Sequence, residues 1–210
     1  SNMGGAGDEK LENLNDGKIY VFDKNYKWIK GEEPVKEKFG PSMAIGRIIS
    51  NNTKNPVGII NVSKGGSNIS EWQKSKYDNS LYQNLLKKAF SAQTQGKIKG
   101  VFFLQGEADA VQDSSIAKVE NWHVFFEKFV KDLRIDLKND SLPIVFGQIG
   151  KSNSLQWEKV KESQEKVNLK NVMMIKTDDL TPGADGEHYD SNGYKKLGIK
   201  FGKVYVSNFK

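Results

Sequence analysis

The sequence contains no cysteine, and this absence removes several kinds of chemistry. Disulfide bonds, zinc sites built on thiolates and a cysteine nucleophile are all excluded. Arginine is almost absent too, since Arg47 and Arg134 are the two arginines among 32 basic residues. Arginine is the usual side chain for bidentate contacts to phosphate and guanine, so no nucleic-acid partner is expected, although the net charge is +6. Chemistry must come from oxygen and nitrogen groups.

Long hydrophobic runs are also missing. The longest apolar segments, such as 57–62 and 101–104, fall far short of the roughly 20 residues that a membrane helix needs. No membrane partner is therefore expected. A length of 210 residues with 37% hydrophobic content fits one domain, spanning 1–210, with a full core.

Hydrophobic periodicity alternates along the chain between strand-like and helix-like patterns. Strands are expected at 18–22, 57–62, 98–104, 143–149 and 172–176, and helices at 41–50, 80–95, 115–137, 155–167 and from about 191 onward. Residues 23–40 are expected to form an irregular loop. Strands that alternate with helices indicate a three-layer α/β/α sandwich with a central parallel sheet. Ligands in such folds bind beyond the carboxyl ends of the strands.

Histidine is scarce, with His123 and His188 as the only two. Imidazole is the side chain whose ordinary pKa lies near neutrality, so proton transfer would fall to one of them. Asp185 stands three residues before His188 in a glycine-rich segment and could hold the ring Nδ1–H, leaving Nε2 as a base. A simple surface histidine is the alternative. His123 lies within a predicted helix, where a structural role is favoured over metal ligation, and no metal or cofactor is predicted.

Three of the predicted strand exits carry unusual residues. They are Gly65-Gly66-Ser67, Gln105-Gly106-Glu107 and the segment 177–188. Paired glycines let backbone N–H groups approach a ligand oxygen, and the Gln105 amide could add a further donor. These features predict an oxyanion hole, although ordinary turns would explain the first two segments equally well.

Four sequence blocks resemble those of one family, in the same order. Ser1-Asn2-Met3-Gly4-Gly5 resembles the motif G-Q-S-N-M-x-G without its first two residues, and 61–72 resembles x-x-G-G-[ST]-x-I-x-x-W after an apolar strand. Residues 105–110 resemble Q-G-E-[SA]-D-A, and 185–193 resemble D-x-x-H-[YF]-x-x-x-G. The chain thus resembles carbohydrate O-acetylesterases of the sialate O-acetylesterase type (carbohydrate esterase family six), within the SGNH hydrolase superfamily. The resemblance runs from residue 1 to about residue 198.

The resemblance implies a flavodoxin-like SGNH hydrolase fold and a serine esterase that needs no cofactor. It implies Ser1 as the nucleophile, His188 as the general base and then acid, and Asp185 as the residue that orients His188. The oxyanion hole and its supports would be the backbone N–H groups of Ser1 and Gly66, the side chain of Gln105, and the supporting residues Gly65 and Glu107. The implied partner is an acetylated carbohydrate, either acetylxylan, another polysaccharide or O-acetyl sialic acid. A secreted or periplasmic location is slightly favoured.

The sequence departs from the family at its beginning. The family's first strand precedes the nucleophile and lies in the middle of the sheet, so we expect that strand to be missing before Ser1 and the sequence to be cut there. The opposing interpretation treats Ser1-Asn2 as a cloning remnant, which would remove the serine assignment. Two other functions share the same fold. They are a sugar O-acetyltransferase using the same site and an inactive carbohydrate-binding relative, in which Ser1 and His188 would not be within about 3 Å of each other.

Overall fold

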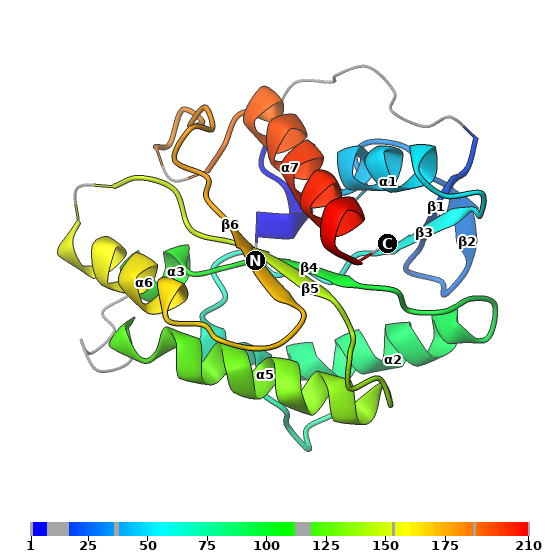
Figure 1. Cartoon of the computed structure of the whole chain (residues 1–210), viewed down its shortest axis with the longest axis horizontal. Coiled ribbons are helices and arrows are strands. Elements are labelled where there is room, and N and C mark those ends of the chain that lie inside the picture. Colours follow the sequence, from blue (N-terminus) through cyan, green and yellow to red (C-terminus); the bar gives the residue numbers. More distant parts are fainter. Residues whose placement is uncertain are drawn as a thin grey trace.

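The computed structural model describes residues 2–7, 17–35, 38–111, 119–152, 154–186 and 188–209 (Figure 1). Along the chain, its elements are η1 (Asn2–Gly4), β1 (Ile19–Phe22), β2 (Trp28–Lys30), α1 (Ser42–Asn51), β3 (Val57–Ile60), η2 (Ile69–Trp72), α2 (Leu81–Gln93), β4 (Val101–Leu104), α3 (Glu107–Val111), α5 (Trp122–Asp136), β5 (Ile144–Gly147), α6 (Leu155–Glu165), β6 (Val172–Ile175) and α7 (Ser191–Phe209). None of the helices within these described ranges is long and apolar enough to cross a membrane.

The strands form two sheets of three, ordered β2-β1-β3 and β4-β5-β6. β1 pairs with β3 in parallel, and β4, β5 and β6 are parallel to one another, whereas β2 is antiparallel to β1. Helices α1 and α7 lie over one side of the sheets, and α2 and α5 lie over the other (Figure 1). The predicted three-layer α/β/α architecture with parallel strands is therefore confirmed.

The layer formed by α1 and α7 depends on close contact between the two helices. A Cβ atom added at Gly198 would lie 2.3 Å from the carbonyl oxygen of Pro41 and 2.6 Å from the Cβ of Ala44. Glycine lets α7 approach the start of α1 this closely. The two helices of this layer are thereby packed directly against each other.

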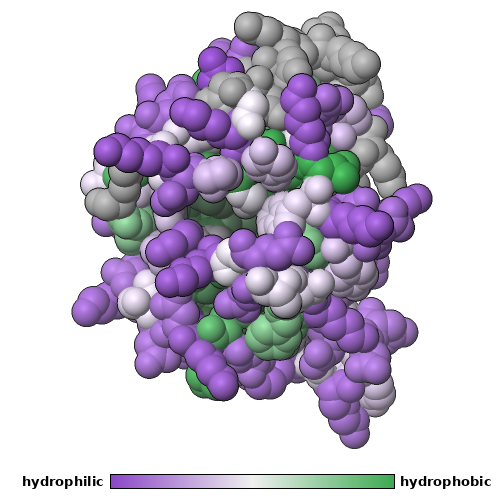
Figure 2. Space-filling model, turned by 90° about the vertical axis from the view of Figure 1, so that its right-hand side faces the viewer, coloured by the Kyte–Doolittle hydropathy of each residue, from purple (hydrophilic) through white to green (hydrophobic). Residues whose placement is uncertain are grey.

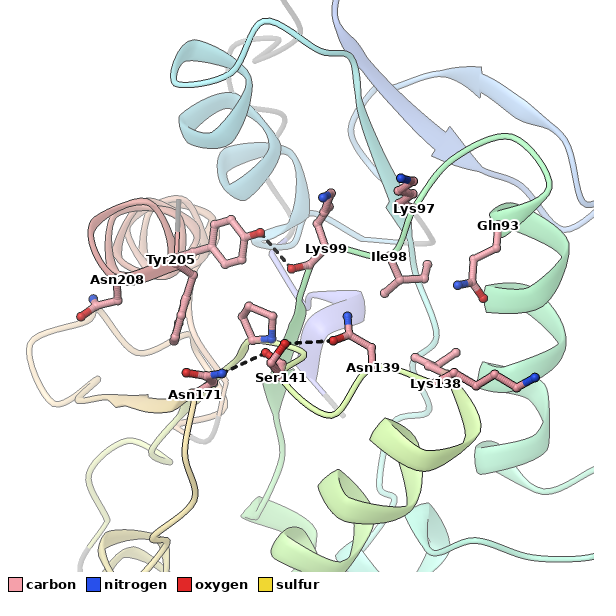
Figure 3. A pocket seen from close by; sticks show the side chains of 13 residues that line it. Gln93, Lys97, Ile98, Lys99, Lys138, Asn139, Ser141, Asn171, Tyr205 and Asn208 are labelled. Atoms are coloured by element: carbon pink, nitrogen blue, oxygen red, sulfur yellow. Dashed lines mark hydrogen bonds between the residues drawn. The ribbon is translucent and has the colours of Figure 1, made fainter.

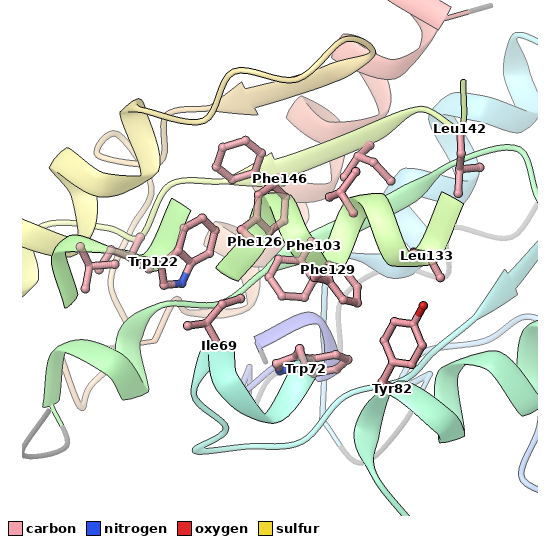
Figure 4. Packing of buried hydrophobic residues seen from close by; sticks show 14 of the residues in the cluster. Ile69, Trp72, Tyr82, Phe103, Trp122, Phe126, Phe129, Leu133, Leu142 and Phe146 are labelled. Carbon is pink, nitrogen blue, oxygen red and sulfur yellow. The ribbon is translucent and has the colours of Figure 1, made fainter. Parts of the chain in front are cut away.

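The opposite side of the sheet holds an aromatic core. Trp122 and Phe126 of α5 stack with their ring centroids 4.9 Å apart, and Phe126 also packs on Phe146 of β5 at 4.7 Å. Trp72 of η2 meets Phe103 of β4 edge to face at 5.5 Å (Figure 4). The segment that follows β3 is therefore anchored to the same core as β4 and β5.

A slot of about 920 Å³ separates the two sheets. One wall follows β3 and the residues after it, and the other follows 95–103, which include β4. Among the described residues no strand lies between β3 and β4. Figure 2 shows a recess with hydrophobic side chains on the face where β4 begins. The lining of the slot also includes Met3 of η1 and residues of α1, α2 and α7.

Two elements differ from the sequence expectation. β2 lies inside the segment predicted to be an irregular loop, and α3 begins in the predicted loop after β4. β2 is a three-residue strand at the edge of its sheet, too short to show an alternating pattern. α3 spans five residues, and two of its buried residues are the acids Glu107 and Asp109, which do not resemble an apolar helix face.

Tyr194 offers a test of the core through a single atom. Its side chain is 0% exposed, and its hydroxyl has no hydrogen-bond partner in the part of the chain that the structure describes. A buried hydroxyl without a partner costs about 1–3 kcal/mol, so Tyr194→Phe should leave the free energy of unfolding unchanged or raise it by about 1 kcal/mol. Urea unfolding measures this change.

The matched control is Tyr189→Phe. The Tyr189 hydroxyl donates to Thr177 Oγ1 at 2.7 Å, so its removal should lower the free energy of unfolding by about 1 kcal/mol. Equal destabilisation by the two substitutions would contradict the difference between the hydroxyls.

Candidate active site

The predicted site residues other than Ser1 follow the carboxyl ends of β3, β4 and β6. The segment after β3 and the segment after β4 are joined directly, because Gln105 Nε2 donates to the carbonyl oxygen of Ser67 at 2.9 Å. η1 contacts β4, and Asn61 Nδ2 donates to the carbonyl oxygen of Met3 at 3.2 Å. The start of the described chain therefore lies at the same end of the strands as these two loops.

Asp185 and His188 are joined by two hydrogen bonds. The backbone N–H of His188 donates to Asp185 Oδ1 at 2.9 Å, and His188 Nδ1 lies 2.7 Å from Asp185 Oδ2. The turn between them uses Gly186, whose φ of +71° is in the left-handed region that favours glycine. Since Asp185 engages Nδ1, Nε2 is the ring nitrogen placed for proton transfer to another group. The His188 side chain is 33% exposed, so substrate can reach it.

The loop that carries this pair is closed by its own hydrogen bonds. The N–H of Gly183 donates to the carbonyl oxygen of His188 at 2.6 Å, and Asp190 N–H donates to Thr181 at 3.2 Å. Beneath the loop, Tyr189 donates to Thr177 Oγ1, which in turn donates to the carbonyl oxygen of Gln148 at 2.8 Å. These contacts tie the histidine loop to the ends of β5 and β6.

The glycine pair after β3 forms a tight turn. Gly66 has a φ of +64°, and a Cβ atom built on Gly65 or Gly66 would meet nothing within 4 Å. Ser67 stabilises the turn, because its hydroxyl donates to the carbonyl oxygen of Lys64 at 2.9 Å and accepts from Trp72 Nε1 at 3.1 Å. The space beside both glycines is open, as a ligand site requires.

Gln105 is 1% exposed, and its amide group is engaged on every side. Nε2 donates to Ser67 O and to Asp109 Oδ2, and Oε1 accepts from Trp122 Nε1 at 2.9 Å. Both amide hydrogens thus have partners within the protein. The predicted role of Gln105 as an oxyanion donor stays a prediction, and the contacts add a second role, the joining of two loops.

α3 places two buried acids beside this amide. Glu107 and Asp109 are 8% and 5% exposed, and Asp109 accepts from Ile69 N–H at 3.0 Å. Burial raises the pKa of Asp109 to about 6, against the opposing effects of the bonds from Gln105 and Ile69, and the charge of Glu107 raises it further. The sequence block 105–110 included both acids, but it carried no signal for the hydrogen bond between Gln105 and Trp122.

Ser1 lies outside the described residues, so its distance to His188 stays a prediction. The residues that follow it lie close to the other site segments. A Cβ atom added at Gly7 would lie 2.5 Å from Oγ of Ser191, which is three residues beyond His188. Together with the Asn61 bond to Met3, this contact places residues 2–7 between the β3 loop and the start of α7.

A separate pocket of about 590 Å³ lies where β4, β5 and β6 begin, at the opposite end of the strands (Figure 3). Lys97, Lys99 and Lys138 lie around it, but the Lys138 amine points away from the other two, and the three amines do not meet at a common centre (Figure 3). Within the described ranges, no group of three or more His, Asp or Glu side chains could hold a metal ion. The stronger candidate site is formed by the loop that carries His188 and by the two loops after β3 and β4, which Gln105 joins.

Parallel strands between helix layers, with an Asp–His pair beyond their carboxyl ends, place a candidate general base where ligands bind in such folds. A family model for carbohydrate esterases, described as sialic acid-specific acetylesterase, matches residues 1–207, and the chain belongs to this family. The protein is therefore a carboxylic ester hydrolase of the carbohydrate esterase type, as the sequence blocks indicated.

Individual relatives agree with this assignment. A probable carbohydrate esterase of Arabidopsis thaliana is 28% identical over 203 residues, which cover 91% of this chain and 75% of the relative. An X-ray structure of an Arabidopsis thaliana protein matches with a TM-score of 0.90 and 26% identity, covering 100% of this chain and 95% of that one.

Two more distant structures share the fold. A carbohydrate acetylesterase from Xanthomonas citri has a TM-score of 0.72 at 19% identity, with 93% of this chain and 50% of that chain covered. NanS has a TM-score of 0.71 at 15% identity, with 91% and 88% covered.

Proposed function

We propose that this carbohydrate esterase removes O-acetyl groups from a carbohydrate through an acyl-enzyme on Ser1. The observation that carries the proposal is the double hydrogen bond between Asp185 and His188, which fixes the imidazole and its tautomer. Family membership supports deacetylation of carbohydrates as the general reaction. The acyl-enzyme on Ser1 and the particular acetylated carbohydrate go beyond family membership and are proposals.

In the proposed mechanism, His188 Nε2 takes the proton of the Ser1 hydroxyl as Ser1 Oγ attacks the acetyl carbonyl carbon. The tetrahedral intermediate collapses, the sugar oxygen leaves, and it takes the proton from His188. Water then attacks the acetyl-serine while His188 takes a proton from it, and the bond to Ser1 Oγ breaks as His188 returns that proton to the serine oxygen and acetate is released. Asp185 stabilises the imidazolium that forms in each half of the reaction.

Backbone N–H groups of Ser1 and Gly66 are proposed to hold the negative oxygen of the intermediate. The open space beside Gly65 and Gly66 supports this placement. Gln105 is the third proposed donor. To act as one, it would have to exchange its bond to Ser67 O for a bond to the substrate oxygen, because both of its amide hydrogens have partners.

The test is acetate release from a panel of acetylated carbohydrates, with acetylxylan and O-acetyl sialic acid as the two principal members. We expect release by the parent protein and none above background by Ser1→Ala. Adding an unacetylated acceptor sugar separates hydrolysis from transfer, because a transferase would form acetylated acceptor in place of free acetate. Parental activity in Ser1→Ala would contradict the proposal that an acyl-enzyme forms on Ser1.

A further inference from the structure

A buried polar clamp joins the loop after β3 to the loop after β4. Its members are Gln105 and Asp109 on one side and the backbone of Ser67 and Ile69 on the other. Gln105 Nε2 spans from Ser67 O to Asp109 Oδ2, and both oxygens of Asp109 lie within 3.2 Å of Ile69 N. Ser67 follows Gly66 directly, and Ile69 lies two residues further along the chain. The clamp therefore restrains the glycine turn.

The clamp also determines which way the Gln105 amide faces. Trp122 Nε1 is a donor and can face only the amide oxygen, whereas the Asp109 carboxylate, when ionised, can face only the amide nitrogen. Trp122 itself is fixed by stacking on Phe126, and its ring nitrogen points toward the η2 side in Figure 4. A reversed amide would place its NH₂ group against the Trp122 N–H and its oxygen against the Asp109 carboxylate.

Burial of the Asp109 carboxylate costs free energy unless hydrogen bonds such as these compensate for it. The carboxyl is 5% exposed, and a buried carboxylate is stable only when hydrogen bonds compensate for lost water. Its bonds go to Gln105 and to Ile69 N–H, one on each side of the gap between the loops. Glu107, on the same short helix, is the charged group that acts on it among the described residues. Lys64, in the loop after β3, pairs with Glu71 of η2.

We propose that Asp109 is a positioning residue, which acts through the Gln105 amide and the Ile69 N–H to hold the Gly65-Gly66 turn in its catalytic geometry. This inference rests on the proposed function, since the turn is the proposed source of oxyanion N–H groups. Displacing such a donor weakens transition-state binding more than substrate binding. The effect should therefore fall on kcat and leave KM nearly unchanged.

The experiment compares Asp109→Asn with Asp136→Asn. An asparagine at 109 replaces one carboxylate oxygen with an N–H that faces Ile69 N–H or Gln105 Nε2, and it removes the negative charge from the acceptor that both donors share. We expect kcat for p-nitrophenyl acetate to fall about 10-fold or more, with faster hydrogen exchange at residues 65–69. Asp136 also accepts two hydrogen bonds, from Lys74 and Tyr82, but on α5 away from the turn. Asp136→Asn should lower the thermal midpoint and leave kcat and the exchange of the turn unchanged.

A second variant guards against misfolding of the first. Trp122→Phe removes the indole N–H that orients Gln105 and keeps an aromatic ring, so it should lower kcat in the same direction by a smaller factor. In a double-mutant cycle, Gln105→Ala and Asp109→Ala should give losses in kcat that are less than multiplicative, because both break one clamp. Independent multiplicative losses, or parental kcat in Asp109→Asn, would overturn the positioning role.

The two proposals fail in different ways. If the parent hydrolyses no acetyl ester, the proposed function is wrong, and exchange at 65–69 in Asp109→Asn still decides whether the clamp holds the turn. If the parent is active and His188→Ala is not, yet Asp109→Asn has parental kcat and parental exchange, the clamp alone is refuted.

Discussion

His188→Ala is expected to lower kcat for p-nitrophenyl acetate by about 10⁴-fold or more, which is the usual cost of removing the base from a serine triad. The other histidine, His123, cannot take over, because it lies on α5 with its Nδ1 3.0 Å from Ser163 Oγ. KM should change little, since the imidazole acts on the proton rather than on the substrate. Steady-state kinetics of the purified variant measure both constants.

His123→Ala is the matched control for this experiment. It removes the same kind of side chain from a position between α5 and α6, and it should retain parental kcat while losing some stability. Hydrolysis by His188→Ala at the parental rate would rule out the proposed mechanism. Equal losses in the two variants would point to misfolding instead of catalysis, and thermal unfolding distinguishes the two.

The largest expected effect on stability concerns Glu33, before α1. Burial raises the pKa of Glu33 to about 7 from its ordinary 4.5, against the opposing effect of N–H groups of Met43, Val35 and Gly40. The folded state therefore binds the proton more tightly than the unfolded state. The stabilisation that this carboxyl gives is fully present below about pH 4.5 and is lost as the pH rises through about 7, a loss of up to about 3 kcal/mol.

Glu33→Gln should remove this loss. Relative to the parent, its free energy of unfolding should rise by up to about 3 kcal/mol between pH 4.5 and pH 8. Urea unfolding at several pH values measures the difference, which isolates Glu33 from Asp109, whose raised pKa acts with the same sign in both proteins. Glu32→Gln is the control, because that side chain is 64% exposed. A constant difference between Glu33→Gln and the parent at all pH values would contradict the prediction.

Much of the fold followed from periodicity. The buried strands and long helices repeat strongly enough to be found, and β3, β4, β5 and β6 all lie within their predicted segments. β2 escaped because three residues at a sheet edge have exposed or half-buried side chains and no buried face. α3 escaped because its buried residues include Glu107 and Asp109, and burial of acids depends on partners that a local pattern does not reveal.

Local contacts of the candidate site could likewise be predicted from the sequence, whereas its long-range contacts could not. The spacing of Asp185 and His188 was enough to predict their contact, because both lie in one short loop. The contacts of Gln105 with Trp122 and of Asp109 with Ile69 join segments 17 and 40 residues apart. Such pairings depend on the packing of α3, α5 and η2 around β4. The sequence blocks therefore predicted the candidate residues, while the joining of the two loops is visible only in the folded structure.

The loop that carries Asp185 and His188 has a consequence for folding order. This pair closes a loop of three residues, whereas the clamp closes loops of about 40, and short loops close at lower entropic cost and faster. We expect the acid–base pair to form as a local structure during folding and the glycine turn to be fixed only when both sheets have assembled. Activity should then report the last long-range step of folding, not the first.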